Sequence, residues 1–129
     1  MPADWHASLV HIGPVAGECS PSLVTSFPGA FIGVTPQGWM RQWDDAGRVT
    51  RGEWSGAAAV LPHADAVVLS EEDVAGDRTL VVDYARQARC LLLTEGAAGC
   101  TVYVAGDTHR IPAPMVREVD PTGAGDVFA

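Results

Sequence analysis

The strongest chemical signal in the sequence is the string DPTGAGDVFA at residues 120–129. Gly123, Ala124 and Gly125 carry little or no side chain, so backbone N–H groups can converge there on a bound anion. A helix that begins at Asp126 would point its unpaired N–H groups at the same place. The Asp126 carboxylate could then accept a proton from an attacking alcohol while the amides hold a phosphoryl group.

Taken alone, this string has a simpler interpretation, an ordinary loop in which an aspartate caps a helix. The complete string resembles the C-terminal signature of the PfkB, or ribokinase-like, family of carbohydrate and nucleoside kinases. That signature is Asp-x-x-Gly/Ala-Ala/Gly-Gly-Asp-x-Phe, and residues 120–128 match each fixed position. The resemblance implies ATP-dependent transfer of a phosphoryl group to a hydroxyl of a sugar or a similar, nucleoside-like small molecule. The resemblance implies that Asp126 is the general base and that the amides of residues 123–125 stabilise the negative charge of the transition state.

A second motif, TEGAAG at residues 94–99, directly follows an apolar run. By the same resemblance it is a Thr-x-Gly-x-x-Gly nucleotide-binding turn, in which Thr94, Gly96 and Gly99 line the ATP. Glycines suit this role because they let the backbone approach a ligand closely. The residues alone favour equally a β-turn that leads into a hairpin.

A third motif, SEED at residues 70–73, occupies the place of the family's Asn-x-x-Glu motif, which is associated with magnesium and phosphate handling. Ser70 stands for Asn and Asp73 for Glu, so oxygen ligands remain but reach less far. The resemblance implies that both help to organise Mg²⁺ through water. In the alternative, which does not exclude the first, Ser70 caps a following helix whose first turn is acidic.

Two further residues and a second hypothesis follow from the resemblance. Asp120 and Thr122 lie where many relatives hold a monovalent cation such as K⁺ beside the anion hole, although Asp120 before a proline is equally typical of a turn. The Ser-x-x-Asp departure leaves open a non-catalytic nucleotide-binding or interaction module that kept the fold and lost transfer.

The elements that must position these motifs alternate between strands and helices. Apolar runs predict strands, and periodic or capped segments between them predict short helices. Residues 36–55 are predicted to form a loop with a small hairpin, and residues 100–111 a hairpin that turns at Gly106-Asp107. The predicted strands are 8–12, 30–34, 64–69 and 90–94, and the predicted helices are 21–27, 57–61, 71–75 and 77–88. This alternation predicts an α/β layered fold with a mostly parallel central sheet.

The resemblance treats residues 1–129 as a partial ribokinase-like domain that is incomplete at both ends. It would lack the N-terminal substrate and lid region and the C-terminal helices. A parallel sheet without its covering helices exposes apolar faces and edges. We therefore expect poor stability and little or no catalysis from these 129 residues alone, and the resemblance leaves a homodimer open.

The composition of the chain disfavours some classes of binding partner and some cellular locations. The formal net charge of −8 disfavours nucleic acid, whose binding depends on Lys and Arg. Three cysteines without CxxC spacing, and no signal peptide, favour a reducing cytoplasm over a disulfide framework. No apolar run is long enough to span a membrane. The four histidines have no metal-binding spacing, and neither a P-loop nor a GxGxxG motif occurs.

Overall fold

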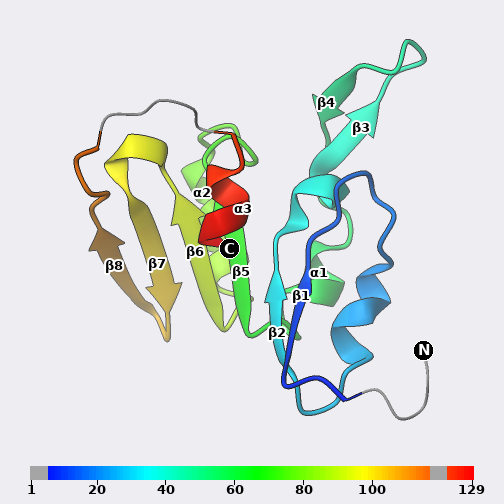
Figure 1. Ribbon diagram of the computed structural model, residues 1–129, viewed down its shortest axis with the longest axis horizontal. Coiled ribbons are helices and arrows are strands. Elements are labelled where there is room, and N and C mark those ends of the chain that lie inside the picture. Colours follow the sequence, from blue (N-terminus) through cyan, green and yellow to red (C-terminus); the bar gives the residue numbers. More distant parts are fainter. Residues whose placement is uncertain (1–5, 117–121) are drawn as a thin grey trace.

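The computed structural model describes residues 6–116 and 122–129, which form an α/β arrangement around a six-stranded sheet (Figure 1). The first four strands in the sheet order are parallel, and the last two continue it as an antiparallel hairpin. In spatial order the strands are β1 (Leu9–Ile12), β2 (Phe31–Val34), β5 (Ala66–Ser70), β6 (Cys90–Thr94), β7 (Cys100–Val104) and β8 (Asp107–Ile111). The predicted α/β class and the mostly parallel sheet are confirmed.

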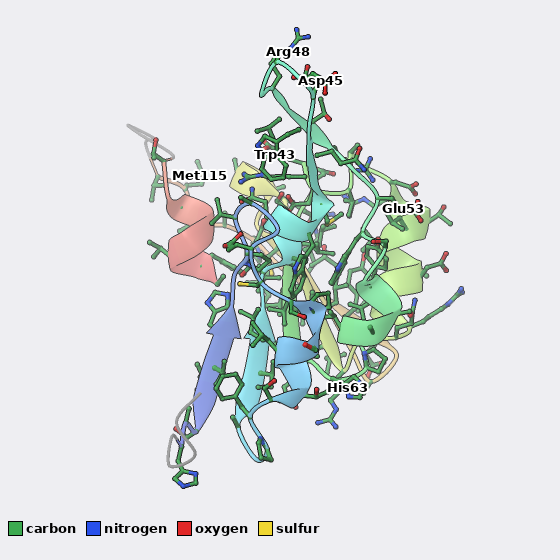
Figure 2. The ribbon with its side chains drawn as sticks, turned by 90° about the vertical axis from the view of Figure 1, so that its right-hand side faces the viewer. Trp43, Asp45, Arg48, Glu53, His63 and Met115 are labelled. Carbon is green, nitrogen blue, oxygen red and sulfur yellow. The ribbon has the colours of Figure 1, made fainter. Side chains whose placement is uncertain are left out.

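Short helices and one separate hairpin connect these strands. The α-helices are α1 (Ala57–Val60), α2 (Arg78–Ala85) and α3 (Ala124–Phe128). The 3₁₀ helices are η1 (Pro21–Thr25), η2 (Pro36–Met40) and η3 (Gly96–Ala98). The predicted hairpin within residues 36–55 is present as β3 (Arg41–Trp43) paired with β4 (Val49–Arg51). It projects away from the main sheet in Figures 1 and 2.

The two central strands, β5 and β6, bury alternate residues because successive side chains of a strand point to opposite faces. Val67, Leu69, Leu91 and Leu93 are inaccessible to solvent on one face, and the residues between them are only partly buried. Helix α2 packs on the buried face through Val81 and Tyr84. Its start is fixed by Asp77, whose side chain accepts hydrogen bonds from two backbone N–H groups of the first turn.

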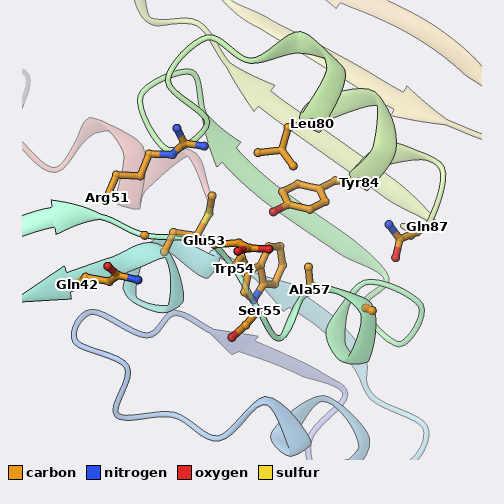
Figure 3. A pocket seen from close by; sticks show the side chains of 12 residues that line it. Gln42, Arg51, Glu53, Trp54, Ser55, Ala57, Leu80, Tyr84 and Gln87 are labelled. Atoms are coloured by element: carbon orange, nitrogen blue, oxygen red, sulfur yellow. The ribbon is translucent and has the colours of Figure 1, made fainter.

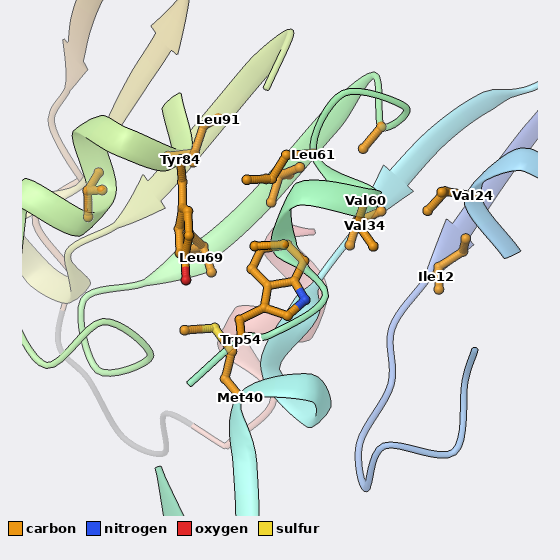
Figure 4. Packing of buried hydrophobic residues seen from close by; sticks show 14 of the residues in the cluster. Ile12, Val24, Val34, Met40, Trp54, Val60, Leu61, Leu69, Tyr84 and Leu91 are labelled. Carbon is orange, nitrogen blue, oxygen red and sulfur yellow. The ribbon is translucent and has the colours of Figure 1, made fainter. Parts of the chain in front are cut away.

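Trp54 lies at the centre of the apolar core between the sheet and these helices (Figure 4). Its indole stacks on Trp39 with ring centroids 6.0 Å apart and meets the edge of Tyr84 at 5.4 Å. Within the described residues the buried Trp54 Nε1 has no hydrogen-bond acceptor. Two of the tryptophans near the hairpin therefore pack in the core, whereas Trp43 is exposed.

Three predicted elements differ from the structure. Residues 71–76 form consecutive turns where a helix over 71–75 was predicted. The β7–β8 hairpin turns at Ala105 and Gly106, both with positive φ, one residue before the predicted Gly106-Asp107. Helix α3 begins at Ala124 and not at Asp126, and Gly123 takes a left-handed conformation at its N-cap.

The two faces of the sheet are covered unequally. Helices α1 and α2 lie on one face, and the five-residue α3 lies over the other (Figures 1 and 2). Leu9, Phe31 and Ile111 are exposed, and the strand registers place them on the α3 side. Exposed apolar surface was expected from the sequence, and part of it lies on this face. None of the helices described is both long and apolar enough to cross a bilayer.

Candidate active site

The candidate site lies at the carboxyl ends of β5 and β6, where the predicted motifs SEED and TEGAAG begin. Ser70 and Thr94, the last residues of these strands, are register partners in the sheet. The Thr94 hydroxyl donates to the Leu69 carbonyl at 3.3 Å, and the Glu71 N–H donates to the Thr94 carbonyl at 3.0 Å. The structure therefore brings these two motifs together, because carboxyl ends of parallel strands meet at one edge.

The turn after β5 is held by a reciprocal pair of hydrogen bonds. The Ser70 N–H donates to Asp73 Oδ2 at 2.8 Å, and the Asp73 N–H donates to Ser70 Oγ at 3.1 Å. This is the pattern of a capping box, although turns follow it and not a helix. Ser70 and Asp73 thus support each other locally, but the helix that the capping alternative expected after Ser70 is absent from residues 71–76.

The residues of this turn, Ser70 and Asp73, can be compared with the ligands that Mg²⁺ needs. No cluster of three or more His, Cys, Asp or Glu residues suited to a metal occurs in the described parts of the chain. Magnesium is commonly held by one or two carboxylates, with waters and substrate phosphates supplying the remaining ligands. A single carboxylate at Asp73 with the Ser70 hydroxyl beside it fits that indirect mode.

The two glycines of the turn after β6 have different environments. Gly96 has a φ of +55°, and a Cβ there would meet open space. Gly99 has a φ of +101°, and a Cβ there would collide with the backbone of Ile111 and lie 2.6 Å from the Ala113 nitrogen. The glycine at 99 is therefore required by contact with the chain after β8, and the open space at 96 is what close approach of a ligand needs. The sequence interpretation gave both the same role.

Glu95, between these motif residues, was missed by the sequence interpretation. Its side chain is only 3% exposed, and Oε1 accepts from Arg78 Nη2 at 2.7 Å while Oε2 accepts from Thr101 Oγ1 at 2.8 Å. The hydrogen bonds from Arg78 and Thr101 hold the pKa of Glu95 below its usual value. The available signal was an acidic residue inside a turn expected to face a polyanion.

The third motif lies around the start of α3. The Val127 N–H donates to the Gly123 carbonyl at 3.0 Å, which closes the helical turn over Ala124 and Gly125. A Cβ at either glycine would meet nothing within 4 Å, so the space around this backbone is open. Figures 1 and 2 place the start of α3 at the same edge as the carboxyl ends of β5 and β6.

The remaining predicted residues are only partly placed. Asp126 is the third residue of α3, so it belongs to the first helical turn, where the helix dipole favours a carboxylate; its side chain lies outside the described parts. Thr122 is exposed in the turn before α3. Asp120 lies outside the described residues.

A separate pocket of about 630 Å³ opens on the α2 side of the molecule (Figure 3). Arg51 and Glu53 from the β4 region and Tyr84 from α2 line part of it. Its lining contains no residue predicted for phosphoryl transfer. The candidate site is therefore the strand edge beside α3 and not this pocket.

Comparison with known proteins identifies the class and the family. The chain superposes on a pyrophosphate-dependent kinase in the ribokinase family with a TM-score of 0.74 at 20% identity, over 96% of this chain and 47% of that one. The fold is thus ribokinase-like. Residues 50–129, more than half of the chain, match the model of the pfkB family carbohydrate kinases. The chain belongs to this family, as its motifs predicted.

Two curated relatives extend the comparison. The chain is 33% identical to a fructokinase of Klebsiella pneumoniae over 135 residues, which cover 92% of this chain and 43% of that protein. It is 40% identical to an inositol 3-kinase of Zea mays over 72 residues, which cover 55% of this chain and 18% of that protein. The chain spans less than half the length of either relative.

Proposed function

We propose that this chain is the phosphoryl-transfer portion of a kinase that moves the terminal phosphoryl group of ATP to a hydroxyl of a sugar or a similar small molecule. The observation that carries the proposal is the start of α3. Left-handed Gly123 directly precedes the helix, and open space surrounds the Gly123 and Gly125 backbone. Family membership supports the same chemistry, because the matched region includes this segment.

In the proposed mechanism the backbone and one carboxylate divide the work. The first-turn N–H groups of a helix lack partners within the helix, and those around residues 123–125 would stabilise the charge of the transferring phosphoryl group. Asp126 would accept the proton of the attacking hydroxyl. Thr94 and Gly96 would border the nucleotide, and Gly99 would hold the turn in shape.

Two pairs of residues are proposed to hold metal ions. Ser70 and Asp73 would hold Mg²⁺ through water, and Asp120 with Thr122 would hold a monovalent cation such as K⁺. Mg²⁺ bound to the donor would neutralise charge that develops on its phosphates.

The phosphoryl donor is tested separately, because the ribokinase-family structure described above is a pyrophosphate-dependent kinase. We propose ATP, since the TEGAAG turn matches the nucleotide-binding motif of the family. Turnover with ATP and none with pyrophosphate would support this donor, and the reverse would overturn it. Fructose and inositol are the first acceptors to test, given the two relatives.

A non-catalytic nucleotide-binding module is the second candidate. One observation favours it: Ser70 and Asp73 are engaged with each other, so the departure from the family's Asn-x-x-Glu pattern forms a self-contained turn. Thermal stabilisation by ATP without turnover, in the product of the complete gene, would support the module. Cytoplasmic location and homodimer formation stay predictions.

The decisive variant is Asp126→Asn in the product of the complete gene. Loss of the general base should remove at least about 100-fold of the transfer rate, while ATP still raises the melting temperature. Asp45→Asn is a matched control, because Asp45 is exposed at the tip of the β3–β4 hairpin (Figure 2). Equal rates for the two variants would refute the assignment of Asp126.

A further inference from the structure

One guanidinium joins the two turns of the candidate site. Arg78 is the first residue of α2, and its Nη2 donates to Glu71 Oε1 at 3.0 Å and to Glu95 Oε1 at 2.7 Å. Glu71 belongs to the turn after β5, and Glu95 belongs to the turn after β6. Arg78 therefore bridges the two turns through its side chain, in addition to the backbone hydrogen bond from the Glu71 N–H to the Thr94 carbonyl.

Glu95 is held on more than one side. Besides Arg78, its carboxylate accepts from the Thr101 hydroxyl at 2.8 Å and lies 3.9 Å from Arg110 Nη2. Its backbone N–H donates to the Gly99 carbonyl at 2.8 Å, which closes the turn. A buried carboxylate is stable only when it is paired and hydrogen-bonded, so this residue fixes the shape of the turn that contains it.

The positive charge of Arg78 has a second role beside its contacts. Glu95 lies inside the turn that the proposed donor would approach, and Glu71, Glu72 and Asp73 lie in the turn beside it. Unpaired carboxylates at this edge would repel phosphate oxygens. Arg78 contacts two of these four acidic residues, so it offsets negative charge where a polyanion must bind.

We infer that Arg78 and Glu95 are positioning residues for phosphoryl transfer: Arg78 pairs with Glu95 in the turn after β6 and with Glu71 in the turn after β5, and this bridge presents both turns to an anionic donor. This inference rests on the proposed function. Neither residue is placed against the reacting atoms, and each acts through the backbone of the turns. Removing either partner should weaken use of the donor and leave recognition of the acceptor unchanged.

The same strands supply a matched control at their opposite ends. Arg89 Nη1 donates to Asp65 Oδ1 at 2.8 Å, and these residues directly precede β6 and β5. The two Arg78 contacts bridge the turns that follow β5 and β6, and the Arg89–Asp65 pair bridges the residues that precede these strands. Both arginine side chains are exposed, at 51% and 71%. The Asp65 pair lies at the amino ends, away from every predicted site residue. Loss of an ion pair as such therefore affects both, whereas loss of site geometry affects only the Arg78 pair.

The test compares Arg78→Met, Glu95→Gln, their double variant and Arg89→Met in the product of the complete gene. We expect Arg78→Met and Glu95→Gln each to lower kcat/KM for ATP by about 10- to 100-fold through displaced turns, with KM for the acceptor unchanged. The double variant should lose less activity than the product of the two single losses, because both changes act on the shared Arg78–Glu95 contact. Arg78→Lys should recover most of the activity, and Arg89→Met should resemble the unmodified protein.

Three outcomes would overturn the inference. Arg78→Met could match Arg89→Met in kcat/KM for ATP. A loss in Arg78→Met without a loss in Glu95→Gln would mean that Arg78 binds the donor directly. Additive losses in the double variant would mean that the two residues act separately. An unmodified protein without turnover contradicts the proposed function instead, and the same ranking is then measured by ATP-dependent thermal stabilisation.

Discussion

The contrast between Gly96 and Gly99 gives the most specific prediction about the nucleotide turn. The change is Gly99→Ala, with Gly96→Ala as its control in the same turn. At position 99 the backbone has φ +101° and ψ −132°, a region that side chains rarely adopt, and the added Cβ would collide with backbone atoms of Ile111 and approach Ala113. Backbone atoms cannot rotate away as a side chain can.

The expected magnitudes follow from these environments. Forcing a non-glycine residue into such a backbone region costs about 1–3 kcal/mol, and overpacking costs about 1–3 kcal/mol more. Gly99→Ala should therefore lower the free energy of unfolding by about 2–6 kcal/mol. At Gly96 the φ of +55° is left-handed and the space is open, so only about 1 kcal/mol is expected.

Denaturant titration of both variants measures this difference, and ATP kinetics separate it from function. Gly96→Ala should lose only about 1 kcal/mol of stability and should raise KM for ATP, because the new methyl group occupies space that a ligand needs. Gly99→Ala should unfold at a lower denaturant concentration than Gly96→Ala. If Gly99→Ala loses no more free energy of unfolding than Gly96→Ala, then the backbone contact with Ile111 does not determine this glycine.

Three further predictions follow from burial and charge. Trp54→Phe should cost less stability than Trp54→Ala, because it keeps an aromatic ring beside Trp39 and Tyr84 and removes an N–H that has no acceptor within the described residues. Trp54→Ala should cost about 3–5 kcal/mol, and denaturant titration compares the two variants. The pKa of Glu95 is lowered from its ordinary value of 4.5, so the charged carboxylate stabilises the fold above that pH. This contribution to stability should disappear as the pH falls through the lowered pKa, and Glu95→Gln should flatten that part of the stability–pH curve. The 129-residue chain by itself should bind a hydrophobic dye through the α3 face and show little or no transfer, and a sharp thermal transition without dye binding would contradict this.

Strands and their order along the chain were predictable from the sequence because they depend on local patterns. The runs at 64–69 and 90–94 are mostly apolar, which is typical of strands buried in a parallel sheet, and the structure has strands at Ala66–Ser70 and Cys90–Thr94. Helix α2 was predicted over 77–88 from apolar periodicity and is shorter, since it ends at Ala85. Such differences at helix ends are common, because the last turn has few constraints.

The features that were missed depend on contacts between distant residues. The acidic residues at 71–73 favoured a helix, but the Ser70–Asp73 hydrogen bonds stabilise a turn instead. The environment of Gly99 depends on the chain after β8, and the role of Glu95 depends on Arg78, 17 residues earlier. No local pattern reports such contacts. Family motifs located the candidate site, but they did not show how its turns are held together.

The central claim is that the backbone at residues 123–125 and the Asp126 carboxylate together transfer a phosphoryl group. Its most direct test is single-turnover transfer from radiolabelled ATP in the product of the complete gene, with the unmodified protein compared with Asp126→Asn. We predict labelled acceptor from the unmodified protein and none within the same time from the variant, although the variant still binds ATP. Undiminished labelling of the acceptor by Asp126→Asn would contradict the account.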